Sequence, residues 1–107
     1  MCSSLAPQFA ALGDPTRLAI IERLMAEGPQ PAGALQDVAE ISAPAISRHL
    51  KVLRAAGLVQ QQVDAQRRIY SVDPQAIRAI GTWTITRRDF WEGSLDRLAI
   101  LLDSDKD

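Results

Sequence analysis

The sequence has little of what catalytic and metal-binding proteins require. Its 107 residues include one cysteine, Cys2, and one histidine. A disulfide within the chain is therefore excluded, and a zinc site, which needs several nitrogen or sulfur ligands, is not expected. There is also no Gly-rich phosphate loop and no GxSxG segment around a serine. We therefore expect no metal, no other cofactor and no enzymatic activity. Cys2 is interpreted as a terminal residue rather than a redox site.

Long apolar runs are also missing. None reaches the length needed to cross a bilayer, and the opening segment MCSSLAPQFAALGDP lacks the basic start and apolar stretch of a secretory signal. The expected location is the cytoplasm, without a membrane partner. Aromatic residues make up only 5% of the chain and charged residues 23%, against 47% hydrophobic residues. That balance is typical of a globular protein, and the length predicts one domain spanning residues 1–107.

The net charge is small, at −1, but the charges are unevenly distributed. Residues 42–72 contain five basic side chains against one acidic one, a net charge of +4. Residues 1–41 contain two basic and five acidic side chains, and residues 73–107 contain five basic and seven acidic ones, so both flanks are acidic. A basic middle segment is what phosphate binding requires, and we expect the acidic flanks to face away from the phosphates.

Caps and apolar periodicity predict two helices at the start of the chain. Residues 7–12 are expected to form or begin a short helix. The segment GDPTRLAIIERLMAEGP predicts a stronger one, because Asp14 can cap it, Pro15 fits its first turn and Gly28 can end it. The inner face of this second helix is expected to carry Leu18, Ile21, Leu24 and Met25.

Two further helices are predicted next, joined by a short turn. The first of them spans about residues 31–39. Ser42 is expected to cap the other, over residues 43–56, and Gly57 to end it. The buried stripe of this helix is predicted to be Ile46, Leu50 and Leu53. Two helices joined by such a turn form a helix-turn-helix.

After residue 57 the pattern changes to that of strands. Two runs rich in β-branched residues, 58–63 and 67–72, flank a short turn and predict a hairpin. A final helix is predicted over 74–102, with a bend or weak turn at GTWTIT, residues 81–86, because that segment is a poor helix former. The expected fold is mainly α with a small β-hairpin, in the arrangement of a winged helix-turn-helix.

The helix at 43–56 has the size and chemistry to enter the major groove of duplex DNA. With its apolar stripe turned inward, small and basic side chains remain outside, and Arg48 can bridge the two acceptors of guanine. The hairpin adds a second basic group that can probe the minor groove. The candidate DNA-binding residues are Ser42, Ala43, Ala45, Ser47, Arg48, His49, Lys51, Arg54, Gln66, Arg67 and Arg68.

Each of these residues also has a plainer interpretation. Basic residues on an exposed helix face are usually only solvated, and it is the joint pattern of capped helix, basic outer face and basic hairpin that favours DNA. His49 could instead pack against its own helix. Tyr70 is expected to pack in the core or the hairpin rather than to stack on a base.

Four segments together resemble the ArsR family of winged helix-turn-helix repressors, over about residues 8–102: FAALGDPTRLAIIERL, ISAPAISRHLKVLRAAGLV, RRIYSVDP and FWEGSLDRLAILL. The resemblance implies a homodimeric DNA-binding repressor, often acting on its own operon. It places the recognition helix at 43–56, the wing at 58–72 and the dimer interface on the first and last helices.

The chain departs from the metal-sensing members of that family. The segment PAGALQDVAE holds no Cys-x-Cys pair, and the last helix has no histidine. The resemblance therefore implies a branch without metal sensing. The wing tip departs as well, with Ala65 where the family usually has glycine.

A dimer also has a physical argument of its own. The last helix carries both tryptophans, one phenylalanine and several leucines, and a domain this small has little left to cover them. A two-fold interface is therefore favoured over core packing. It would present two recognition helices about 34 Å apart to a palindromic operator. The candidate interface residues are Leu5, Phe9, Ile80, Trp83, Phe90, Trp91, Leu95, Leu98 and Leu102.

Two alternatives remain open. Winged helices also serve as protein-docking scaffolds, so the chain could be an interaction module that has lost DNA binding. A small organic effector could also bind near Trp83 and Trp91, although aromatic residues at helical spacing more often pack in a core or an interface. The salt dependence of binding to a palindromic duplex separates a DNA-binding regulator from the interaction module.

Overall fold

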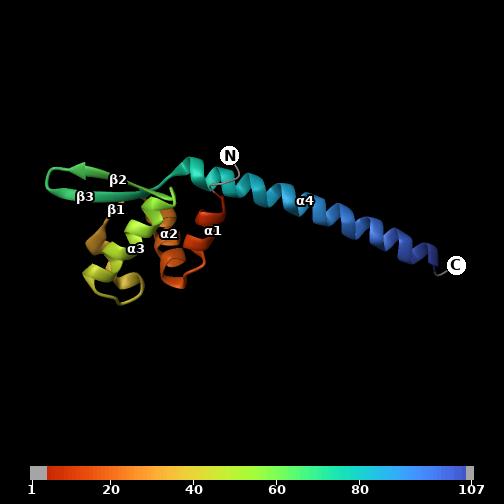
Figure 1. Cartoon of the computed structure of the whole chain (residues 1–107), viewed down its shortest axis with the longest axis horizontal. Helices are drawn as coiled ribbons and strands as arrows, with labels where there is room; N and C mark the ends of the chain where they lie inside the picture. Colours follow the sequence, from red (N-terminus) through yellow and green to blue (C-terminus); the bar gives the residue numbers. More distant parts are fainter. Residues whose placement is uncertain (1–4, 106–107) are drawn as a thin grey trace. The chain divides into compact units, whose positions relative to one another are not determined.

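The computed structural model describes residues 5–105, which divide into one compact unit up to Ile77 and a second unit from Arg78 onward. The first unit contains the helix-turn-helix and the hairpin (Figure 1). In chain order, the elements are helix α1 (Leu5–Leu12), helix α2 (Pro15–Glu27), strand β1 (Gln30–Pro31), 3-10 helix η2 (Ala32–Val38), helix α3 (Ala43–Ala55), strands β2 (Val59–Asp64) and β3 (Arg67–Val72), and helix α4 (Pro74–Asp105). The predicted fold class is confirmed, with one additional strand.

Helices α2 and α3 begin and end by the same local rules. An extended residue, Asp14 before α2 and Ser42 before α3, accepts a hydrogen bond from the backbone N–H three residues later, at 3.0 and 3.3 Å. A proline in the first turn of each helix lacks an N–H that would have had no partner there. Each helix is followed by a glycine with positive φ, 83° at Gly28 and 81° at Gly57. Both caps and both stops were predicted from the sequence.

The core of the first unit lies between α2, η2, α3 and one face of the hairpin. The predicted buried stripe of α3 is confirmed. In α2, Ile21 and Leu24 are buried as predicted, but Leu18 and Met25 are 42% and 57% exposed. That part of the prediction is wrong, because the buried side of α2 includes Ile20 and leaves these two residues on its edges. The largest fully buried side chains are Ile20, Leu35, Ile46, Leu50, Leu53 and Leu58.

The sheet has three antiparallel strands in the order β1–β3–β2. The predicted hairpin is confirmed, with its first strand beginning one residue later than expected. Strand β1 pairs Gln30 with Tyr70 and Pro31 with Ile69. Two residues are too few to display an alternating pattern, so the sequence did not indicate β1. Pro31 has no N–H to donate, which is tolerated at the edge of a sheet.

The helix predicted at 31–39 is a 3-10 helix rather than an α-helix. Gly33 lowers the α-helical propensity of this short segment. With three residues per turn, Ala32, Leu35 and Val38 lie one above another. This winding directs Leu35 into the core, where its side chain is fully buried.

Helix α4 continues without interruption through residues 81–86, so the predicted weak turn is wrong. The Thr84 and Thr86 hydroxyls donate to the backbone oxygens of Ile80 and Thr82, both at 2.9 Å. These bonds satisfy the hydroxyls within the helix. The propensity deficit, a few tenths of a kcal/mol for most residues and about 1 kcal/mol for glycine, is not enough to interrupt a long cooperative helix. Within residues 5–105, no helix is both long and apolar enough to span a bilayer.

Candidate nucleic-acid interface

The side of α3 that faces away from the core carries a row of basic side chains. Arg48, Lys51 and Arg54 are all exposed. They are three residues apart, so they follow one another along one side of the helix. The apolar stripe of α3 is buried on the opposite side, which fixes the rotation of the helix and keeps the basic row in solvent.

The start of α3 is small and polar. Ser42, Ala43 and Ser47 are exposed, and Ala45 is half-buried. The Ser42 hydroxyl caps the helix by accepting the Ala45 N–H. Small side chains at this end of the helix leave room for it to approach the bases of a groove closely.

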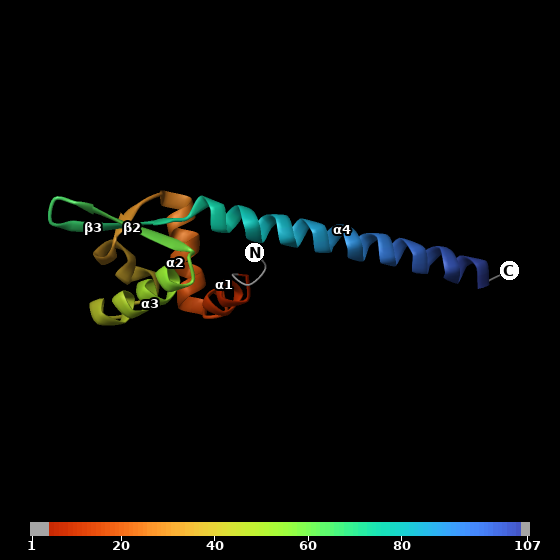
Figure 2. The same cartoon turned by 45° about the horizontal axis from the view of Figure 1, so that its top comes forward.

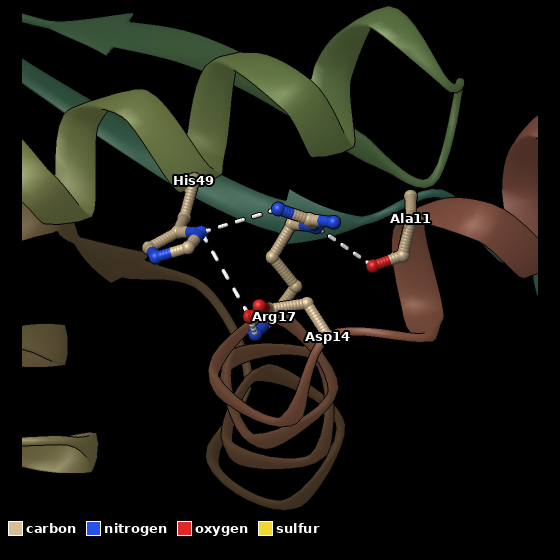
Figure 3. Close-up of polar contacts among 4 residues, drawn as sticks. All are labelled: Ala11, Asp14, Arg17 and His49. Atoms are coloured by element: carbon tan, nitrogen blue, oxygen red, sulfur yellow. Dashed lines mark hydrogen bonds and ion pairs between the residues drawn. The ribbon is translucent and has the colours of Figure 1, made fainter.

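His49 lies differently from its neighbours on α3. Its side chain is only 23% exposed, and its Nδ1 atom lies 3.5 Å from Nη1 of Arg17 and 4.0 Å from Oδ2 of Asp14 (Figure 3). The imidazole is therefore turned toward the start of α2 rather than outward with the basic row. This arrangement does not support the prediction that His49 contacts DNA. The prediction rested on the spacing of residues along α3, and that spacing could not reveal the contacts of His49 with Arg17 and Asp14.

The wing closes through a two-residue turn. Asp64 pairs with Arg67, which leaves Ala65 and Gln66 to connect the strands. Ala65 has a φ of 58°, a conformation that glycine adopts more readily than alanine. Gln66, Arg67 and Arg68 are exposed, as their predicted role requires.

The register of the hairpin separates its two arginines. Side chains alternate between the faces of a strand, and residues directly opposite each other share a face. Arg68 therefore lies on the face of Tyr70, which is 8% exposed and packs in the core. Arg67 lies on the other face, directly opposite Asp64. Only Arg68 is thus on the side of the hairpin that also faces the helices.

A groove runs between the second half of α3 and strand β2. Lys51 and Arg54 line it from the helix, and Gln60 and Gln61 line it from the strand. Gln61 donates from Nε2 to the Tyr70 hydroxyl oxygen at 2.8 Å, which holds its side chain in place. These two glutamines were not among the candidate site residues. The run of glutamines beside the basic wing is the sequence signal that could have identified them.

The two basic elements lie at one end of the first unit. In both views, the β2–β3 turn and the N-terminal end of α3 are at the left, while α1 lies on the opposite side of α2 (Figures 1 and 2). Arg48 belongs to the half of α3 nearer this end, and Arg68 is the second residue of β3 after the turn. The structure therefore brings the two predicted basic groups to the same end of the unit.

The predicted dimer residues are divided between the two units. In the first unit, Leu5 is half-buried and Phe9 is 39% exposed. In the second unit, Ile80 is half-buried, and Arg87 lies over the Trp83 ring at 5.5 Å from its centroid. Phe90 and Trp91 meet edge to face, with ring centroids 5.6 Å apart. Most of the predicted residues are large, apolar and exposed on α4: Trp83, Phe90, Trp91, Leu95, Leu98 and Leu102.

One carboxyl group in the first unit has a shifted pKa. The pKa of Asp14 is held below its ordinary value of 3.8, chiefly because the carboxylate accepts the backbone N–H of Arg17. The charge of the Arg17 side chain lowers it further. In the part of the chain that the structure describes, no three His, Cys, Asp or Glu side chains gather as metal ligands.

Known proteins are similar to this chain in sequence and in fold. A family model described as a helix-turn-helix domain matches residues 12–62. The chain is 44% identical over 99 residues to the HTH-type transcriptional regulator Rv2034 of Mycobacterium tuberculosis, covering 92% of this chain and 89% of that protein. It is 31% identical to the transcriptional repressor SdpR of Bacillus subtilis, over 72% of this chain and 84% of that protein. The solved structure of an ArsR-like transcriptional regulator from Rhodococcus sp. RHA1 matches with a TM-score of 0.75 and 28% identity, covering 90% of each chain. The chain therefore belongs to the ArsR family of winged helix-turn-helix transcriptional regulators.

Proposed function

We propose that this chain is a repressor that binds a palindromic operator in duplex DNA through α3 and the β2–β3 hairpin, as a homodimer and without sensing metal. The observation that carries the proposal is the exposure of two basic groups, on α3 and beside the wing turn, at one end of the first unit. Its relative SdpR carries the name transcriptional repressor, which supports repression. The proposed location is the cytoplasm.

The contacts with DNA divide between reading bases and holding phosphates. The start of α3 enters the major groove, where Arg48 can place its two parallel donors on the O6 and N7 acceptors of a guanine. Lys51 and Arg54, further along the helix and lining the groove beside β2, are placed for phosphates. The proposed contact residues are Ser42, Ala43, Ala45, Ser47, Arg48, Lys51, Arg54, Gln66 and Arg68, whereas Arg67 lies on the other face of the hairpin and is left out.

The homodimer follows from the apolar surface of α4. All described residues of the second unit belong to one helix, so no other element of that unit covers its side chains. Trp91, Leu95, Leu98 and Leu102 recur at intervals of four, three and four residues and are 51–62% exposed. Their average interval of about 3.7 residues keeps these four side chains on one side of the helix, where a second helix can pack along them in a seam. Burying a large apolar side chain contributes about 1.5–3 kcal/mol, so a second copy of α4 is a favourable cover.

The DNA-binding proposal is tested by titrating two duplexes with the protein at several salt concentrations. One duplex carries the DNA immediately upstream of its own gene, and the other carries the same bases in shuffled order. We expect tighter binding to the upstream duplex and a steep loss of affinity with salt. Arg48→Ala should abolish the preference while retaining most of the shuffled-duplex affinity. Weak binding of both duplexes, indifferent to salt, would instead support a protein-interaction module.

The dimer is tested by measuring molar mass in solution. We expect the parent protein to sediment as a dimer and a Trp91→Glu, Leu98→Glu variant to sediment as a monomer, because two charges would have to be buried in the seam. A control variant with Arg88→Glu, at an exposed position already paired with Glu92, should remain dimeric. A parent protein that is monomeric at micromolar concentration would contradict the proposal.

A further inference from the structure

Polar groups from three helices meet at one corner of the first unit (Figure 3). Arg17, in the first turn of α2, donates from Nε to the backbone oxygen of Ala11 near the end of α1, at 2.8 Å. The Nη1 atom of the same guanidinium lies 3.5 Å from Nδ1 of His49 on α3. The Asp14 carboxylate, which caps α2, lies 4.0 Å from that nitrogen. Arg17 therefore connects the end of α1 to the recognition helix.

These contacts bear on which nitrogen of the His49 imidazole accepts a hydrogen bond. A guanidinium can only donate hydrogen bonds, so Nδ1 of a neutral His49 acts as the acceptor. In the neutral imidazole, the Arg17 contact favours the tautomer with its proton on Nε2. At 3.5 Å the contact is long, and it gains strength from the charge on Arg17. Turning the imidazole outward, to the level of Arg48 and Lys51, would break this contact.

We propose that His49 is a positioning residue, which holds α3 in place against the α1–α2 corner through Arg17 instead of contacting DNA. The inference rests on the proposed function, because it concerns the placement of the helix that reads the operator. The apolar stripe of α3 holds the helix against the core, but apolar contacts are non-directional. A directional contact at His49 limits sliding and rotation, and a bidentate arginine–guanine pair requires such accuracy from the neighbouring Arg48.

Three substitutions at one position separate this role from DNA contact. His49→Asn places an amide group near the position of Nδ1, His49→Gln places one near Nε2, and His49→Ala provides neither. If His49 positions α3, Asn should stay within about threefold of the parent affinity for the upstream duplex, while Gln and Ala should lose about tenfold. The salt dependence on shuffled DNA should not change for any of them, because no phosphate contact is lost.

Two results would overturn the proposal. Rescue by Gln but not by Asn would mean that Nε2 contacts a base. A salt slope that falls by about one in His49→Ala would mean that the imidazole contacts a phosphate. Thermal unfolding of each variant is measured in parallel, so that a loss of folded protein is not mistaken for a loss of recognition.

Arg17 supplies a test that is independent of the choice of side chain at position 49. If the two residues act through one link, the Arg17→Ala, His49→Ala double variant should bind the upstream duplex no more weakly than Arg17→Ala alone, whereas additive losses would contradict the link. Arg23→Ala is the matched control, since Arg23 is also on α2 but pairs with Glu27 and Asp37. If the parent showed no salt-dependent preference for DNA, the proposed function would fail. Unfolding measurements on the same variants would then still test the link, because coupled effects on stability support it and additive effects exclude it.

Discussion

The two arginines beside the wing turn provide a sharp test, because they are adjacent in sequence and lie on opposite faces of the hairpin. Arg68 shares its face with the buried Tyr70, and Arg67 lies opposite Asp64 on the other face. We predict that Arg68→Ala weakens binding to every duplex, while Arg67→Ala has little effect. The two variants remove the same side chain and the same charge, so each controls for the other.

The magnitude follows from counterion release. Each phosphate contact contributes about 0.9 to the slope of log affinity against log salt. If the contribution vanishes near 1 M salt, one lost contact lowers the affinity about eightfold at 0.1 M and about fourfold at 0.2 M. A homodimer with both hairpins engaged would lose about 1.8 from its slope. For Arg67, whose face carries the Asp64 carboxylate directly opposite, we expect a change of less than about 0.3 per copy.

Fluorescence anisotropy with labelled duplexes at four salt concentrations from about 0.05 to 0.3 M measures these slopes. The upstream and shuffled duplexes should be affected alike by Arg68→Ala, because a phosphate contact carries no sequence information. Equal slope changes in the two variants would refute the assignment of faces. An effect of Arg68→Ala confined to the upstream duplex would mean that Arg68 reads a base instead.

Three further predictions concern stability. Ser42→Ala should lower the free energy of unfolding by about 1 kcal/mol in urea denaturation, because the α3 cap is lost, whereas Ser47→Ala on the exposed side of the same helix should change it by less than about 0.5 kcal/mol. Leu53→Ala should lower the free energy of unfolding by about 2–5 kcal/mol in the same assay, because the Leu53 side chain is fully buried. An equal loss from Val52→Ala, at a 42% exposed position, would contradict this reasoning. The pKa of Asp14 is lowered by folding, so its contribution to stability is present above pH 3.8 and is lost as the pH falls through the lower folded-state pKa. Thermal unfolding should therefore show that the parent loses more stability below pH 3.8 than Asp14→Asn does. The asparagine can still cap α2 but does not titrate. Equal losses in the two proteins would exclude this contribution.

The parts of the fold that sequence reasoning predicted are those decided within a few residues. A cap at Ser42 and a stop at Gly57 act over one turn of helix, and the periodic stripe of α3 needs only that helix to be recognised. The resemblance to the ArsR family added the expected roles of these elements, namely the recognition helix, the wing and the dimer interface. The bend or weak turn expected at residues 81–86 of α4 was wrong because the poor helix formers there were judged one by one, without the hydroxyl bonds of Thr84 and Thr86.

The parts that were not predicted depend on residues far apart in the sequence. Strand β1 exists because β3 pairs with it, about 40 residues later. His49 was placed on the DNA-facing side of its helix by spacing alone, but Arg17, 32 residues earlier, approaches its Nδ1 atom. The positive φ of Ala65 follows from the two-residue connection, which the composition of the turn did not indicate.

The strict one-to-one register of β2 and β3 restricts how this wing can change during evolution. Adding a single residue to β3 between Arg68 and Tyr70 would reverse the faces of its outer portion, turning Arg68 away from the helices and Arg67 toward them. Adding one residue to each strand next to the turn would lengthen the wing while leaving every existing strand side chain on its own face. Functional relatives should therefore differ in wing length mainly by even numbers of residues, or carry a bulge where the number is odd.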